Sequence, residues 1–160
     1  MSIPVLLVDT PPAMASAHEV PRINIPFGAL YLGESLKRAG FDPVIYDPKT
    51  GTGIHQCGTV FYAGDSPERI HDRIRYAAPR IIAIANLMSK DTGVALQIAS
   101  LARAACPDAV IAVGGYHATA APEDILSQPS VDIAAIGEGE DTIVEIARCV
   151  EAGQDFRTVA

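Results

Sequence analysis

The chain has 160 residues, of which 49% are hydrophobic and 19% charged, and its formal net charge is −7. A chain of this size and composition can bury one ordinary core, so we expect a single domain over residues 1–160. The acidic balance without a basic stripe argues against a nucleic-acid-binding protein, and the short apolar stretches predict a cytoplasmic protein without a membrane span.

Short apolar runs recur along the chain and predict five buried strands. These runs are 5–8, 44–46, 80–85, 109–113 and 132–136. Between them, apolar residues at helical spacing predict helices over about 27–39, 66–79, 92–106 and 143–150, with one short helix at 122–126. We expect the segments 13–26 and 50–65 to lack regular structure, the second because it holds four glycines.

Strands that alternate with helices predict an α/β fold. The expected architecture is a Rossmann-like or flavodoxin-like doubly wound sheet of five parallel strands, with helices on both faces. We expect the strand order 2-1-3-4-5, because the long excursion after the second strand suits the edge of a sheet. Many functions share this fold, so the function has to be sought in the loops.

Four loops follow the predicted strands at the carboxyl edge, where ligands bind in such sheets. They are rich in glycine and mostly uncharged, which favours a large, partly apolar ligand over a polyphosphate. The candidate binding residues are Thr10, Pro11, Pro12, Asn86, Leu87, Met88, Ser89, Gly114, Gly115, Tyr116, His117, Gly137, Glu138 and Gly139. No Gly-x-Gly-x-x-Gly follows the first strand, which argues against a nicotinamide cofactor.

The three cysteines predict neither a metal site nor a disulfide framework. Cys57, Cys106 and Cys149 are scattered along the chain, and their spacing does not match that of metal ligands. We therefore expect reduced thiols, as in a cytosolic protein, and no metal ligand.

Several short motifs together resemble one family, the amino-terminal cobalamin-binding domain of cobalamin-dependent radical S-adenosylmethionine enzymes. The motifs are Gly-Gly-x-His-x-Thr at 114–119, Pro-Glu at 122–123, Val-Asp at 131–132, Gly-Glu-Gly-Glu at 137–140, Pro-x-Gly at 26–28 and Ser-Pro-Glu at 66–68. The likeness covers nearly the whole chain. The segment 66–84 resembles the anaerobic magnesium-protoporphyrin IX monomethyl ester cyclase branch of this family.

The resemblance implies that cobalamin binds at the carboxyl edge, with its benzimidazole tail beside Gly114 and Gly115. Other cobalamin domains have Asp-x-His-x-x-Gly after the first strand, and its histidine is the lower axial ligand of cobalt. Here residues 9–12 read Asp-Thr-Pro-Pro, and the nearest histidine, His18, is far along the loop. The Ser-x-Leu of those domains is replaced by Ala-Asn-Leu at 85–87. The resemblance therefore implies base-off cobalamin without a histidine ligand and, accordingly, no protein metal ligand.

The resemblance also implies a larger enzyme. The iron–sulfur motif of the family, Cys-x-x-x-Cys-x-x-Cys, does not occur in this chain. The 4Fe-4S cluster and S-adenosylmethionine are expected in a carboxyl-terminal domain of a longer polypeptide, which would be a methyltransferase or an oxidative cyclase. The chain alone is expected to bind and not to catalyse. The alternative is a flavodoxin-like domain that has lost cobalamin and binds another small molecule or a partner protein.

For several candidate residues, a purely structural role is an alternative to ligand binding. Gly114 and Gly115 could form only a tight turn, and His117 could either contact the corrin or cap the following segment. Glu138 is expected to contact the ligand, whereas Glu140 is expected to cap the last helix. We expect the loop that begins at Asn86 to face the corrin.

Overall fold

The computed structural model describes residues 2–156, and its centre is a parallel sheet of five strands with the order β2-β1-β5-β6-β7. The strands are β1 (Val5–Val8), β2 (Val44–Tyr46), β5 (Ile81–Ala85), β6 (Val110–Gly114) and β7 (Ile133–Ala135). This is the predicted order 2-1-3-4-5, and every neighbouring pair is parallel. The predicted α/β class and sheet topology are therefore confirmed.

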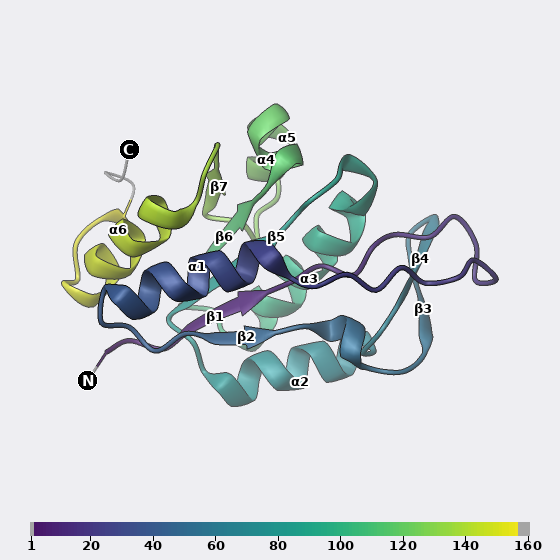
Figure 1. Cartoon of the computed structure of the whole chain (residues 1–160), viewed down its shortest axis with the longest axis horizontal. Helices are drawn as coiled ribbons and strands as arrows, with labels where there is room; N and C mark the ends of the chain where they lie inside the picture. Colours follow the sequence, from purple (N-terminus) through teal and green to yellow (C-terminus); the bar gives the residue numbers. More distant parts are fainter. Residues whose placement is uncertain (1, 157–160) are drawn as a thin grey trace.

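Helices cover both faces of the sheet, as predicted (Figure 1). The helices α1 (Phe27–Arg38) and α6 (Glu140–Glu151) pack on one face, and α2 (Pro67–Ala77) and α3 (Thr92–Ala105) pack on the other. Each pair encloses its own cluster of buried apolar side chains against the sheet. None of the helices in the described part of the chain is long and apolar enough to cross a membrane.

The start of α2 shows how the sequence dictates a helix end. The Ser66 hydroxyl accepts a hydrogen bond from the backbone N–H of Arg69, and Pro67 occupies the first helical position. Serine satisfies an amide that has no partner inside the helix, and proline lacks the N–H that would otherwise need one. The helix ends at Ala77, and residues 78–80 connect it to the strand β5.

The segment after β6 forms two short helices where one was predicted. They are α4 (Tyr116–Ala120) and α5 (Pro122–Leu126). Ala121 separates them with an extended φ of −145°, because a residue before proline is pushed out of the helical region. The prediction of α5 is confirmed, and α4 is an addition to it.

The segment 50–65 is not irregular, so that prediction was wrong. It begins with the end of a 3-10 turn, η1 (Pro48–Thr50), and then forms an antiparallel hairpin of β3 (Ile54–Cys57) and β4 (Val60–Ala63). Gly58 adopts a positive φ of 58° in the two-residue turn, where glycine carries no strain. The hairpin lies beyond the carboxyl ends of β1 and β2, at the right of Figure 1.

The hairpin is anchored from both sides. The side chain of Tyr62 is fully buried in the α2/α3 core. The backbones of Met14 and Phe61 exchange hydrogen bonds of 2.7 and 2.9 Å, so the loop 13–26 is joined to β4. Burial of one face and pairing along one edge explain why four-residue strands are stable here.

Candidate functional site

The structure brings the predicted binding residues to the carboxyl edge of the sheet. Thr10–Pro12 follow β1, 86–89 follow β5, Gly114 ends β6, and 137–139 follow β7. The backbone N–H of Asn86 donates to the carbonyl of Gly114 at 2.7 Å, which joins two of these loops directly. Because the four strands are parallel neighbours, their loops form one continuous surface.

Exposed apolar side chains line this edge. Leu87 and Met88 after β5, Tyr116 after β6 and Ile136 after β7 are between 49% and 76% exposed. We call these four residues the apolar rim. Exposed large apolar side chains that gather along one edge are typical of a surface that binds a ligand or a partner. The rim agrees with the expectation of a large, partly apolar ligand.

Below the rim, the two faces of the sheet differ in the size of their side chains. On the α2/α3 face the last strand positions hold large residues, such as Ile84 and Val113, and these are buried. On the α1/α6 face the last residues of β5, β6 and β7 are alanine or glycine, and Ala83 lies on the same face two residues earlier in β5. These four residues, here called the small-residue strip, are Ala83, Ala85, Gly114 and Ala135.

The small-residue strip is partly exposed although most of it belongs to inner strands. Ala85, Gly114 and Ala135 are in register across β5, β6 and β7, and Ala83 packs at the border of the α1/α6 core. All four residues are half-buried. Inner strands of a doubly wound sheet are normally covered on both faces. The α1/α6 layer therefore leaves the carboxyl end of the sheet partly accessible.

Gly115 has a structural requirement of its own. Its φ is +122°, and a Cβ atom on it would lie 2.5 Å from the carbonyl oxygen of Asn86. Only glycine adopts this conformation without strain, and only glycine allows the β5 and β6 loops to approach so closely. Gly114 differs, because a Cβ atom there would meet only the Cβ of Ala135, at 3.4 Å.

Replacing Gly115 by leucine should therefore destabilise the fold. We expect a loss of about 1–3 kcal/mol of unfolding free energy from the strained backbone, measured by urea denaturation. Gly93→Leu is the matched control, because a Cβ atom at Gly93 has no neighbour within 4 Å and its φ is not left-handed. Equal stability of the Gly115 and Gly93 variants would contradict this prediction.

Several polar side chains of the edge form hydrogen bonds with one another. His117 Nδ1 lies 2.9 Å from the hydroxyl of Ser89, so a side chain of α4 contacts the β5 loop. The Asn86 side chain is fully buried and donates to the Thr92 hydroxyl at 3.0 Å. Asn86 thus lies beneath the surface, while Leu87 and Met88 form it.

Two buried polar atoms at this edge have no hydrogen-bond partner among the described residues. They are Thr10 Oγ1 and Asn86 Oδ1, at the ends of the neighbouring strands β1 and β5. A buried polar atom without a partner costs free energy. A ligand or an ordered water seated at this edge would supply the missing hydrogen bonds.

The loop 137–140 leads from β7 into α6. Glu138 is exposed, and Gly139 lies so close to α1 that a Cβ atom on it would be 3.2 Å from Leu32 Cδ2. Glu140 is the first residue of α6, which has no side-chain cap. Glu140 therefore does not cap the helix with its side chain, and its carboxylate in the first turn is placed to offset the helix dipole.

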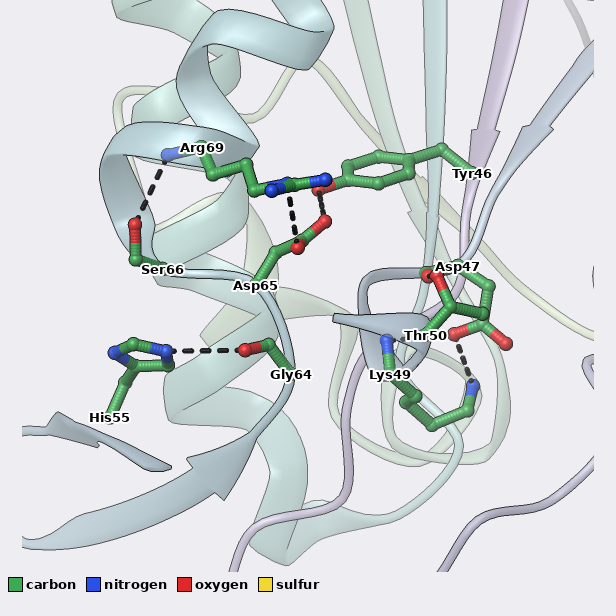
Figure 2. A network of polar contacts seen from close by, with 9 residues as sticks. All are labelled: Tyr46, Asp47, Lys49, Thr50, His55, Gly64, Asp65, Ser66 and Arg69. Carbon is green, nitrogen blue, oxygen red and sulfur yellow. Dashed lines mark hydrogen bonds and ion pairs between the residues drawn. The ribbon is translucent and has the colours of Figure 1, made fainter. Parts of the chain in front are cut away.

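A buried ion cluster at the ends of β1 and β2 was not predicted. The ammonium of Lys49 contacts the carboxylates of Asp9 and Asp47, the latter at 3.0 Å, and the Lys49 side chain is only 2% exposed. Burial lowers the pKa of Lys49 to about 8 and raises the pKa of Asp47, while each carboxylate favours the charged ammonium. Figure 2 shows Lys49 beside Asp47. The signal available in the sequence was an aspartate directly after each of two neighbouring strands.

A second polar contact joins the same region to α2. Figure 2 shows the Tyr46 hydroxyl and the Arg69 guanidinium directed at the carboxylate of Asp65. Their distances to its two oxygens are 2.7 and 2.9 Å. Burial and the hydrogen bond to Asp65 raise the pKa of Tyr46, so the phenol remains a neutral donor. These contacts fix the base of the hairpin.

The ion cluster also borders a hollow of about 340 Å³. Its walls include Pro12, Arg22, Lys49, Thr52 and Ile54, so it lies on the β1/β2 side of the carboxyl edge.

The cysteines Cys57, Cys106 and Cys149 are free and half-buried. Residues 2–156 contain no group of three or more His, Cys, Asp or Glu side chains that could hold a metal ion.

Comparison with known proteins supplies the family of this chain. A family model described as the B12 binding domain matches residues 15–147. Among curated proteins, the chain is 29% identical over 87% of its length to a cytidylyl-2-hydroxyethylphosphonate methyltransferase of Streptomyces wedmorensis. It is 26% identical over 96% of its length to an anaerobic magnesium-protoporphyrin IX monomethyl ester cyclase of Synechocystis sp..

The chain spans only 27% and 29% of the length of these two relatives. Among solved structures, it resembles the cobalamin-dependent S-adenosylmethionine radical enzyme OxsB, whose structure contains aqua-cobalamin and S-adenosylmethionine. The TM-score is 0.66, the sequence identity is 20%, and the match covers 99% of this chain and 20% of OxsB. At this identity the likeness concerns the fold.

Proposed function

Because this chain belongs to the B12-binding domain family, we propose that it binds cobalamin at the carboxyl edge of its sheet. The observation that supports this most is the small-residue strip, which stays partly exposed below the apolar rim. Cobalamin combines a planar corrin ring, edged with amide side chains, and a nucleotide tail. The apolar rim could pack against the corrin ring, and the small-residue strip leaves room for the nucleotide tail on the α1/α6 face.

The proposed contacts come from all four loops of the carboxyl edge. They are Thr10, Pro11, Pro12, Asn86, Leu87, Met88, Ser89, Gly114, Gly115, Tyr116, His117, Gly137, Glu138 and Gly139. Leu87, Met88 and Tyr116 would pack on the ring, since they are exposed and apolar. Gly114 would lie beside the tail, where the absence of a side chain allows close approach.

We propose further that cobalamin is bound base-off and without a histidine on cobalt. The residues that follow β1 are Asp9, Thr10 and two prolines, none of which offers an imidazole. The carboxylate of Asp9 is already paired with Lys49. When bound, the cobalt centre would supply methyl-group or electron transfer, and this chain would hold and orient it.

The relatives are several times longer than this chain, and we propose that it acts as one module of such an enzyme. The partner would be a radical S-adenosylmethionine domain of the same polypeptide, which carries the iron–sulfur cluster and S-adenosylmethionine. The reaction would be a methyl transfer or an oxidative cyclisation in the cytoplasm, where the three free thiols stay reduced.

The direct test is reconstitution with hydroxocobalamin. After incubation and desalting, the protein should retain close to one equivalent of cobalamin, measured by visible absorbance against protein concentration. The EPR spectrum of the reduced Co(II) form should lack splitting by an axial nitrogen. A colourless protein would overturn cobalamin binding in favour of a flavodoxin-like domain with another ligand, and nitrogen splitting would overturn only the base-off proposal.

A further inference from the structure

The short helix α4 carries side chains that hold the loops of the carboxyl edge together. His117 on this helix contacts Ser89 of the β5 loop. Two residues later, Thr119 is bonded both within the helix and outside it. Its backbone N–H and its hydroxyl both donate to the carbonyl of Gly115, the residue before α4, and the hydroxyl also accepts from the turn after β7. Its side chain lies between the turn at the end of β6 and the turn after β7.

The Thr119 hydroxyl is both a hydrogen-bond donor and a hydrogen-bond acceptor. It donates to the carbonyl of Gly115 at 3.0 Å and accepts from the backbone N–H of Gly137 at 3.0 Å. Gly115 and Gly137 are 22 positions apart in the chain and belong to different glycine motifs. A hydroxyl that donates to one of them and accepts from the other fixes their separation.

The two glycines contribute no side-chain contact that could hold their turns together. Their φ values are +122° and +76°, and neither has a side chain that could pack or form a hydrogen bond. Glycine loses more conformational freedom on ordering than any other residue. A loop that a ligand has to order costs binding free energy, whereas a loop that is already fixed does not.

We propose that Thr119 is a positioning residue that fixes the Gly115 and Gly137 turns relative to each other before cobalamin binds. This inference rests on the proposed function. The hydroxyl acts through the two turns, so it raises affinity without touching the cofactor. Valine has nearly the shape of threonine and removes the hydroxyl, whereas serine keeps it.

The experiment measures cobalamin affinity and local order in the same variants. In Thr119→Val, hydroxocobalamin should bind about fivefold more weakly, as expected for loss of the solvent-accessible hydrogen bond from Gly137, because the Gly115 carbonyl keeps its bond from the backbone N–H of Thr119. Hydrogen exchange of the Gly137 amide, followed by NMR without cobalamin, should become faster by a similar factor. Thr119→Ser should restore both values toward those of the wild type.

Thr50→Val is the matched control. The Thr50 hydroxyl also donates to a nearby carbonyl, that of Asp47, at 2.8 Å, but it lies on the β2 side of the sheet. This variant should leave both the affinity and the exchange of Gly137 unchanged. Any change in the control would overturn the assignment to Thr119.

The remaining outcomes separate this inference from the proposed function. Weaker binding with unchanged Gly137 exchange would overturn positioning, because Thr119 would then act by direct contact. Faster exchange with unchanged binding would overturn its role in affinity. If the wild type retains cobalamin and Thr119→Val changes neither measurement, only this inference fails. If the wild type retains none, the proposed function fails as well.

Discussion

Replacing Lys49 by methionine should lower the free energy of unfolding by about 3–5 kcal/mol, the usual effect of removing one partner of a buried ion pair. The Lys49 side chain is 2% exposed, and those of Asp9 and Asp47 are 14% and 17% exposed. Without the ammonium, two carboxylates would face each other with little access to water. Urea denaturation followed by circular dichroism measures the loss.

Three further variants, namely Lys37→Met, Asp9→Asn and the double variant Asp9→Asn with Lys49→Met, identify the cause. Lys37→Met removes a charge of the same sign from the exposed last turn of α1, and should cost less than about 1 kcal/mol. Adding Asp9→Asn to Lys49→Met should recover part of the stability, because it removes one of the unpaired charges. A double variant as unstable as the sum of the two single variants would show that charge is not the cause.

The loss caused by Lys49→Met should depend on pH. Burial already raises the pKa of Asp47 above its ordinary value of 3.8, and removal of the ammonium should raise it further. The folded variant then binds more protons than the unfolded chain above about pH 4, so its stability falls as the pH rises. The deficit against the wild type should therefore be smaller at pH 5 than at pH 7.

Replacing Gly114 by leucine should weaken cobalamin binding strongly and leave the fold intact. A Cβ atom at this position makes only a van der Waals contact with Ala135, and the φ of Gly114 is not left-handed. The remaining leucine atoms would extend over the small-residue strip, where we place the nucleotide tail. We expect affinity for hydroxocobalamin to fall about 100-fold, which corresponds to about 2.7 kcal/mol.

Gly93→Leu is the control for Gly114→Leu, since it adds the same side chain to α3, outside the small-residue strip. It should leave affinity for hydroxocobalamin unchanged. Circular dichroism and the urea midpoint should show that both variants fold. Full retention of cobalamin by a folded Gly114→Leu protein would place the tail elsewhere.

The inner strands of the sheet were predictable because they are largely buried on both faces. Runs such as Val5–Val8 and Ile81–Ala85 are wholly apolar, and each is followed by a residue that ends or turns the chain. The same holds for α2, where Ser66 and Pro67 specify the start. Local chemistry of this kind can be read without knowing the neighbours in space.

The hairpin and the ion cluster depend on neighbours that are distant in sequence. The β3 residues alternate between exposed and half-buried, and glycines flank the short strands, so the local pattern resembles a loop. The stability of the hairpin comes from Tyr62 in the core and from the pairing of Phe61 with Met14. Likewise, Lys49 meets Asp9 only because β1 and β2 are adjacent.

The location of the candidate site at the carboxyl edge was predictable, and its geometry was not. The glycine motifs identified the loops, because strand ends in a parallel sheet share one edge. The burial of Asn86 and the clash that a side chain at Gly115 would cause follow from the approach of two loops. The contacts of Thr119 arise in the same way.

The unequal filling of the two sides of the sheet has a consequence for assembly of the holoprotein. On the α2/α3 side, buried isoleucine and valine side chains fill the core as far as the ends of the inner strands. Its packing needs nothing from outside the polypeptide. We therefore expect the α2/α3 side of the sheet to fold without cobalamin, so that the vitamin would bind to a sheet that has already formed.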